Sequence, residues 1–322
     1  MQREDNKLAE TPSDQPDRKV RLEFEIKLHY DVAGPSDFIC NIHAAETLRQ
    51  RVVAEQMAFS LPLLDAPTVE SDVATANRYL RFRSPAGKLE VKYAATVDLF
   101  HHLQDPATIG ETPIADLPPE ALTYLLPSRY CQSDVVSALA RKEFGGMPPG
   151  YARIQAICDW VHDRTKFKIG ASNPSTTALD TYEHRIGVCR DFAHLTITMC
   201  RALNVPARFI SALDYGADPA LGPPDFHAYA ECFLGGRWYI FDSTRISPRT
   251  GLLRLGTGRD AADVAFATIF GPVKTTAPQV WIRAVDDPVS GILPPLDNGL
   301  AVSTDGPGES SPVDRVSASS PG

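Results

Sequence analysis

Apolar and polar side chains alternate at every position from Arg21 to Tyr30. The five apolar positions are Leu22, Phe24, Ile26, Leu28 and Tyr30. A repeat of two residues is the pattern of a β-strand that buries one face and leaves the other in water. Two later stretches, 79–82 and 89–93, continue in a similar way. Because such strands need partners to cover their apolar face, we predict an antiparallel β domain over residues 20–110.

The 322-residue chain is long enough for a second domain. Helical spacing of apolar residues predicts a helix over 151–166, and we assign residues 151–295 to that second domain. The proline-rich stretch 111–150 is predicted to be a packed connector. Residues 1–19 are polar, and residues 296–322 are rich in Gly, Ser, Pro and Asp. We expect both ends to be disordered.

The composition limits the partners of the chain. Its formal charge is −8, from 32 Lys and Arg against 40 Asp and Glu. This balance argues against nucleic acid or an anionic membrane as the main partner. The polar N-terminus lacks the apolar core of a secretory signal, and no apolar run approaches the ~20 residues that cross a bilayer. We therefore expect a cytoplasmic protein that does not bind membranes.

The chain contains six cysteines, none in a CxxC pair. They are Cys40, Cys131, Cys158, Cys189, Cys200 and Cys232. Disulfide frameworks are typical of small secreted chains, and this chain is not small. We expect reduced thiols that are mostly buried as small hydrophobic groups, which is also the most common role of any single cysteine.

One cysteine is predicted to lie at the start of a helix. An apolar stripe with steps of three and four residues runs along Val188, Phe192, Leu195, Met199 and Leu203. Asn204 suits the left-handed position after a helix, and Pro206 prevents its continuation. Cys189 therefore falls in the first turn, where the free N–H groups and the helix dipole favour a thiolate. Small residues on the same face, ending with Cys200, predict close packing of another element.

A hairpin follows this helix. Gly235 and Gly236 separate two strand-like segments, 227–234 and 237–242. A symmetric two-residue turn pairs residues whose numbers sum to 471, so Asp242 faces Tyr229. His227 is then the diagonal neighbour of Asp242, at ~7–8 Å between Cα atoms. A buried carboxylate beside an imidazole fixes its tautomer and stabilises its charged form.

These elements predict a catalytic triad with Cys189 as nucleophile, His227 as base and Asp242 as the orienting acid. We interpret Asp191 as a favourable charge in the first helical turn. His194 lies about 140° round the helix from Cys189 and is a poor base candidate. The Cys189 N–H is the expected oxyanion donor. Tyr229 and Trp238 either line the site or pack in the core.

Four motifs resemble the bacterial transglutaminase-like superfamily, whose members include cysteine proteases. They are Gly187–Leu195 (GVCRDFAHL), Asn204–Arg208 (NVPAR), Phe226–Glu231 (FHAYAE) and Trp238–Thr244 (WYIFDST). The resemblance covers about 150–275, and the β region at 20–110 is similar to the domain that often precedes this core. It implies a papain-like α+β core with the same three catalytic residues. Tyr229 and Ser243 depart from the Trp and Pro that relatives usually have, which concerns substrate details.

The resemblance implies attack of the thiol on a carboxamide and a thioester intermediate. We favour a cysteine-dependent hydrolase of peptide or other carboxamide bonds, with a peptide or protein substrate. The alternatives are a protein-glutamine acyltransferase and an inactive binding module with the same fold. We expect no cofactor, and the lack of an EF-hand loop gives calcium dependence no local support. The Gly- and Pro-rich loop at 216–225 is a candidate lid or specificity loop.

A zinc site is a further alternative that the sequence leaves open. Its conceivable ligands are Cys189, His194, His227 and Cys232. Cys232 is predicted to face away from His227 on the same strand, which disfavours this set. The substrate and the oligomeric state do not follow from the sequence.

Overall fold

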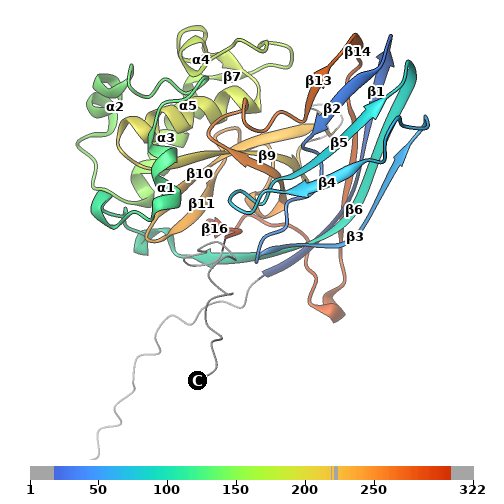
Figure 1. Ribbon diagram of the computed structural model, residues 1–322. Coiled ribbons are helices and arrows are strands. Elements are labelled where there is room, and N and C mark those ends of the chain that lie inside the picture. The colour runs from blue at the N-terminus through green and yellow to red at the C-terminus, as the bar shows by residue number, and fades with distance from the viewer. Residues whose placement is uncertain (1–17, 219, 221–223, 306–322) are drawn as a thin grey trace, which may run out of the picture.

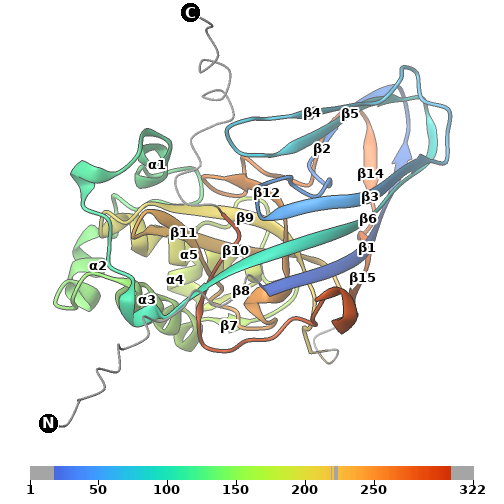
Figure 2. The ribbon, with the colours of Figure 1, turned by 90° about the horizontal axis from the view of Figure 1, so that it is seen from below.

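The computed structural model describes residues 18–218, 220 and 224–305. It has two parts: long twisted strands gather on one side, and helices cover a shorter sheet on the other (Figure 1). Figure 2 shows the same division from below, with β6 (Gly87–Gln104) running along the β part toward the helices. The predicted α+β class, with an N-terminal antiparallel β domain before the core, is confirmed.

The first sheet of the β domain is built around β1 (Arg18–Val32) and β6. These strands pair antiparallel from Arg18–His101 to Val32–Gly87. The alternation predicted for β1 is confirmed, because its five apolar side chains from Leu22 to Tyr30 are at most 5% exposed. Each such buried side chain stabilises the fold by about 1.5–3 kcal/mol. β1 therefore forms the base on which the second sheet packs.

The second sheet of the β domain covers this apolar face. Its strands, in spatial order, are β13 (Ala267–Phe270), β2 (Ser36–Cys40), β5 (Arg78–Ser84) and β4 (Thr68–Ser71). The rings of Phe38 and Phe82 stack at 4.7 Å, and Tyr30 of the first sheet lies 5.1 Å from Phe38. Aromatic contacts thus join the two layers.

The predicted domain boundaries are wrong at the C-terminal side, because strands from late in the chain complete the β domain. β14 (Val273–Thr275) and β15 (Gln279–Val285) pair with β1. On the other side of the sheet, the early strand β3 (Gln50–Phe59) pairs with β6. β13 likewise pairs with β2. These late strands cover sheet edges that β1 and β2 would otherwise leave open. Residues 267–285 therefore belong to the β domain rather than to the second domain.

The predictions for the two ends are also partly wrong. Residues 1–17 lie outside the described residues, whereas Arg18 and Lys19 begin β1. At the other end, β16 (Ala301–Ser303) pairs with the end of β6, and 306–322 lie outside the described residues. The stretch 296–305 was predicted to be disordered from its composition, but backbone pairing and a buried ion pair hold part of it in place.

The second part is a sheet with helix α5 (Cys189–Ala202) packed on it. The strands, in spatial order, are β11 (Arg237–Phe241), β10 (Phe226–Leu234), β9 (Ala207–Asp214) and β12 (Leu252–Gly258). Small residues from α5 and β10 meet in this contact, where Cys200 Sγ lies 3.7 Å from Cys232 Sγ. The predicted close approach on the small-residue face of α5 is confirmed.

Further helices surround α5. Those that contact it are α2 (Ser137–Phe144), α3 (Tyr151–Arg164) and α4 (Ala178–His184). Short helices precede or follow them: η1 (Pro106–Thr108), η2 (Ile114–Asp116), α1 (Pro119–Leu122), η3 (Thr123–Leu125), η5 (Arg249–Gly251) and η6 (Pro288–Ser290). The helix predicted over 151–166 is confirmed as α3. In the described part of the chain, no helix has the length and apolar character that spanning a membrane requires.

A buried group of four charges joins the C-terminal segment to the core sheet. Arg208 Nε donates to Glu231 Oε2 at 2.8 Å, and Arg254 lies against Glu231 and Asp305. Arg208 also contacts Asp305. Burial acts to raise the pKa of the Asp305 carboxyl, but the charges of Arg208 and Arg254 hold it below its usual value. Two carboxylates thus neutralise two guanidinium groups inside the protein.

We expect Asp305→Ala to lower the free energy of unfolding by about 3–5 kcal/mol, because it leaves buried positive charge without its partner. Asp297→Ala is the matched control. Asp297 pairs with Arg249 in the same segment but is 51% exposed, so the expected loss is below about 1 kcal/mol. Urea unfolding of both variants measures the difference, and equal losses would contradict a specific role for Asp305.

Candidate active site

Cys189 is the first residue of α5, and a short parallel ladder leads to it. β7 (Lys166–Phe167) pairs with β8 (Ile186–Gly187), and Lys168 N donates to the Gly187 carbonyl at 2.9 Å. A Cβ at Gly187 would come within 2.7 Å of Asp191 Cβ. Only glycine fits there without displacing Asp191, so the backbone directly before Cys189 packs closely against the first turn of α5.

Asp191 caps the start of this helix. Its Oδ2 accepts a hydrogen bond from Val188 N at 2.9 Å, and the residue is fully buried. The Arg190 guanidinium lies 3.2 Å from the other oxygen. This position agrees with its interpretation as a favourable charge in the first turn.

Cys189 differs from the other cysteines in its exposure. All six thiols are free, five are buried, and Cys189 is partly exposed. Burial raises the pKa of Cys131 to about 11 and that of Cys40 to about 12, which keeps both thiols protonated at neutral pH. The Cys189 sulfur lies 3.8 Å from the carbonyl oxygen of Phe226, the residue before His227. The accessible thiol is therefore next to the predicted base.

His227 and Asp242 form a buried hydrogen-bonded pair. Nε2 of His227 lies 2.9 Å from Asp242 Oδ2, and both side chains are 2% exposed. The other oxygen, Oδ1, accepts from the backbone N–H of Thr244 at 2.9 Å and from its hydroxyl at 2.7 Å. Since Nε2 is bound to Asp242, Nδ1 is the ring nitrogen left for the Cys189 thiol.

Opposing effects set the protonation of this pair. Burial acts to lower the pKa of His227, but the Asp242 charge, its hydrogen bond and the contact with the Cys189 thiol together raise it well above its usual value. For Asp242, burial acts to raise the pKa, and the His227 charge with the Thr244 hydrogen bonds lowers it below the usual value. The raised pKa of His227 and the lowered pKa of Asp242 both favour an imidazolium beside a carboxylate.

The hairpin has the register predicted from its sequence. Ala230 pairs with Phe241 and Leu234 with Arg237, so each pair sums to 471. Gly235 and Gly236 have φ of 55° and 83°, the left-handed values that a tight two-residue turn requires. This register brings Asp242, directly after β11, to the side chain of His227.

Residues around Asp242 to which the sequence assigned no structural role hold it in place. Ser243 Oγ lies 2.6 Å from Thr196 Oγ1 on α5, and the Ser243 carbonyl lies 3.0 Å from His162 Nδ1 on α3. These contacts, with those of Thr244, fix the turn that carries Asp242. The Asp-Ser-Thr sequence is a signal for such a turn, because Asp side chains bind the backbone N–H two residues later.

His194 and Cys232 are placed away from the thiol by their contacts. His194 Nε2 accepts from Ala261 N at 3.1 Å, and its ring stacks on Tyr130 at 5.0 Å. Cys232 lies against Cys200 instead. The four conceivable zinc ligands are therefore not brought together. Across residues 18–218, 220 and 224–305, no three His, Cys, Asp or Glu side chains group in a way that could hold a metal ion.

Tyr229 and Trp238 pack in the protein core, in different clusters, and do not line the candidate site together. Tyr229 lies in a cluster with Ile210 and Ile240. Trp238 contacts Tyr124 at 5.3 Å between ring centroids and carries the Arg208 guanidinium over its face at 4.2 Å. The loop at 216–225 lies partly outside the described residues, at 219 and 221–223, and its proposed role as a lid or specificity loop stays a hypothesis.

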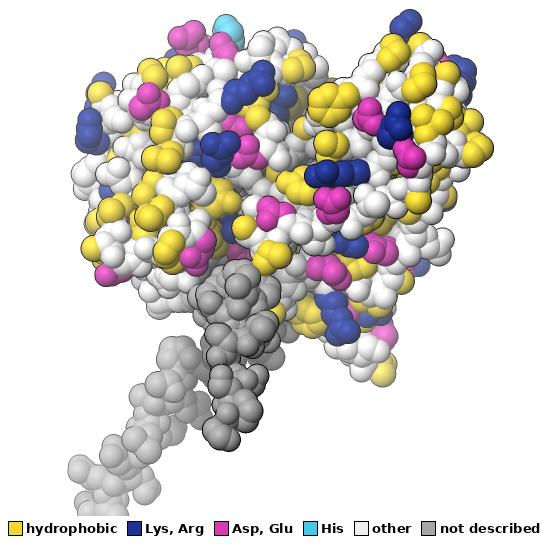
Figure 3. Space-filling view, viewed as in Figure 1, with side chains coloured by type: hydrophobic (Ala, Val, Ile, Leu, Met, Phe, Trp, Pro, Cys, Tyr) yellow, Lys and Arg dark blue, Asp and Glu magenta, His cyan; other side chains and the backbone are white. Residues whose placement is uncertain are grey.

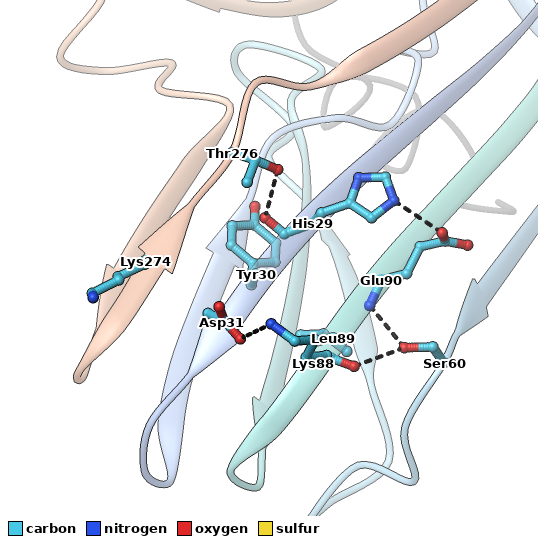
Figure 4. Close-up of a pocket in the computed structure, with 9 residues that line it drawn as sticks. All are labelled: His29, Tyr30, Asp31, Ser60, Lys88, Leu89, Glu90, Lys274 and Thr276. Carbon is cyan, nitrogen blue, oxygen red and sulfur yellow. Dashed lines mark hydrogen bonds and ion pairs between the residues drawn. The ribbon is translucent and has the colours of Figure 1, made fainter.

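A pocket elsewhere in the molecule is a weaker candidate for a functional site. It lies between β1, β6 and β14, has a volume of about 210 Å³ and is drawn in Figure 4. Its charged groups pair with one another: His29 with Glu90 at 3.0 Å and Lys88 with Asp31 at 2.7 Å. On the face shown in Figure 3, basic and acidic side chains are mixed and no large area carries one sign. Cys189 and its neighbours are thus the stronger candidate site.

Both parts of this chain match families of known proteins. Residues 137–243 match the transglutaminase-like superfamily, and residues 20–120 match the bacterial transglutaminase N-terminal domain. A candidate cysteine protease from Cytophaga hutchinsonii, solved at 1.9 Å, is 36% identical, with a TM-score of 0.81. The alignment covers 88% of this chain and 97% of that protein.

Two uncharacterized mycobacterial proteins are more distant relatives. A Mycobacterium tuberculosis protein is 24% identical over 238 residues, which are 68% of this chain and 76% of that protein. A Mycobacterium leprae protein is 26% identical over 145 residues, 44% of this chain, and the match spans about half (52%) of the relative's length. Taken with the matches to both domains and the extensive likeness to the Cytophaga protein, these findings show that the chain belongs to the transglutaminase-like superfamily.

Proposed function

We propose that this protein is a cysteine-dependent hydrolase of peptide or other carboxamide bonds, with Cys189 as nucleophile, His227 as base and Asp242 as orienting acid. One observation carries the proposal. The partly exposed thiol at the start of a buried helix lies beside an imidazole whose other nitrogen is held by a buried carboxylate. This is the arrangement that activates a thiol for attack.

In the first half-reaction, Nδ1 of His227 takes the proton of the Cys189 thiol. The thiolate attacks the carbonyl carbon of the carboxamide, and an S–C bond forms as the carbonyl oxygen becomes an oxyanion. The Cys189 N–H, which has no partner within its own helix at this first position, is a suitable donor to that oxygen. The tetrahedral intermediate then collapses, the C–N bond breaks, and His227 protonates the leaving amine.

In the second half-reaction, His227 removes a proton from a water molecule. The resulting hydroxide attacks the thioester, the S–C bond breaks, and a carboxylic acid leaves. The proton returns through His227 to the sulfur. Asp242 keeps the ring oriented and stabilises the imidazolium in both halves.

Water as the acyl acceptor is supported by the similar Cytophaga protein, which is described as a candidate cysteine protease. A primary amine as acceptor would make the protein an acyltransferase. A mixture of carboxamide peptides incubated with and without a primary amine distinguishes the two by product mass. A carboxylic acid product in the presence of the amine supports hydrolysis, and an amide product contradicts it.

We expect substoichiometric iodoacetamide to label Cys189 selectively and to do so below pH 7, where an ordinary thiol of pKa ~8.5 reacts slowly. The physical reason is that the neighbouring imidazole accepts the thiol proton and the start of the helix favours the thiolate. His227→Ala should weaken labelling at this pH. Peptide mapping by mass spectrometry over pH 5–9 gives the site and the profile.

Cys189→Ala should lower kcat/KM on a responsive carboxamide peptide by at least about 10³-fold, because the nucleophile is absent. Cys40→Ala is the matched control, since Cys40 is a fully buried thiol of the β domain. Labelling spread evenly over the cysteines would instead favour an inactive binding module, and full activity of Cys189→Ala would contradict its role as the nucleophile.

Asp242→Asn should lower the pKa of His227, because burial then acts without the opposing carboxylate charge. NMR titration of the His227 ring protons measures this shift. Asp159→Asn, which removes the exposed carboxylate paired with Arg245, should leave the titration unchanged. An unshifted His227 in Asp242→Asn would contradict the pairing.

The same pair predicts how stability depends on pH. His227 has a raised folded pKa, so its contribution is complete below the unfolded pKa of ~6.5 and is lost as pH rises through the folded value. Asp242 has a lowered folded pKa, so its contribution is complete above ~3.9 and is lost as pH falls through the folded value. The stability difference between wild type and Asp242→Asn should therefore be largest between about pH 4 and 6.5.

A further inference from the structure

An aromatic pair lies beside the candidate nucleophile. The carbonyl oxygen of Phe226 is 3.8 Å from the Cys189 sulfur. The ring of the same residue stacks on Phe266, with centroids 4.9 Å apart and planes inclined by only 11°. Phe226 is partly buried, and Phe266 is 40% exposed. The stack therefore begins at the residue that touches the thiol and ends at the surface.

Phe266 is held in this place by the β domain. Its carbonyl accepts a hydrogen bond from Asn41 N at 3.1 Å, and the next residue, Ala267, pairs with Cys40 of β2. Phe226 belongs to β10 of the core sheet and packs against an apolar cluster that combines β-domain residues with Leu213, Leu253 and Leu255 of the core sheet. The stack thus crosses from one part of the molecule to the other, and Figure 3 shows the outline hollowed where these parts meet.

A single exposed phenylalanine needs no special explanation on a protein surface. This one differs because it stacks nearly parallel on a residue in contact with the nucleophile. Aromatic rings bind other apolar side chains through large contact areas and favour offset-stacked or edge-to-face neighbours. Because the Phe226 backbone carbonyl is 3.8 Å from the Cys189 sulfur, we expect a side chain that flanks the attacked carboxamide to come within reach of Phe226.

We propose that Phe226 and Phe266 form a binding surface for a large apolar or aromatic side chain on the acyl side of the carboxamide. We assign the acyl side because that part stays bonded to Cys189 after the amine leaves, so the contact acts in both half-reactions. The proposal rests on the proposed function and specifies its substrate class. It also gives the β domain a role: the core supplies the reacting groups, and the β domain presents the exposed half of the recognition surface.

The test uses two covalent probes that differ only in the side chain next to the reactive carbonyl. They are the chloromethyl ketones of benzyloxycarbonyl-phenylalanine and benzyloxycarbonyl-glycine, and intact-protein mass gives the rate of modification of Cys189. Wild type should react about 10-fold faster with the phenylalanine probe, the size of effect that an aromatic contact provides. Phe266→Ala should lose this preference, and Phe266→Tyr should retain it.

Phe270→Ala is the matched control. Phe270 is 58% exposed at the end of β13, the strand that begins directly after Phe266, and lies roughly 13 Å from position 266 at ~3.3 Å per residue. It should keep the preference of wild type. Iodoacetamide labelling of Cys189 should be equal in Phe266→Ala and wild type, because this small probe does not reach the stack, and equal melting temperatures would exclude unfolding.

The outcomes separate the two proposals. Fast iodoacetamide labelling without a phenylalanine preference in wild type, or with a preference that survives in Phe266→Ala, overturns the aromatic surface and leaves the proposed function standing. A Cys189 that fails to react with iodoacetamide overturns the proposed function and this inference with it.

Discussion

The close contact between α5 and β10 is the packing on which the candidate site depends. Small side chains on both elements let the helix lie near the sheet, where the sulfurs of Cys200 and Cys232 are 3.7 Å apart. The helix start therefore reaches the start of β10, and Cys189 meets Phe226 and His227. A larger side chain in this contact would move the thiol away from the imidazole without touching either of them.

Local rules predicted the parts of the site that depend on neighbouring residues. Gly235 and Gly236 fix the hairpin register, which places Asp242 beside His227. Asn204, at φ 62°, ends α5 as its sequence position indicates. These features follow from backbone conformation within a few residues, so the sequence contains all the information they need. The catalytic roles of Cys189, His227 and Asp242 remain proposals that the geometry supports.

Other features depend on partners far along the chain, and local patterns did not predict them. The strands within 267–285 cover the edges of sheets formed about 250 residues earlier, and their sequence alone does not identify those edges. The contacts of Ser243 with Thr196 and His162 join three separate elements. Asp305 stands in a stretch whose composition indicates disorder, yet its carboxylate is buried against two arginines. Composition cannot reveal such a pairing because both partners are common surface residues.

The position of Asp305 also affects the order in which the molecule can be completed. Arg208 and Arg254 belong to β9 and β12, and both are synthesised 51 or more residues before Asp305 (305 − 254 = 51). Until Asp305 arrives, Glu231 alone faces the two guanidinium groups, and the core sheet would have to bury a net positive charge. On the ribosome, the sheet that carries His227 therefore reaches its final electrostatic balance only after Asp305 has been synthesised and has emerged.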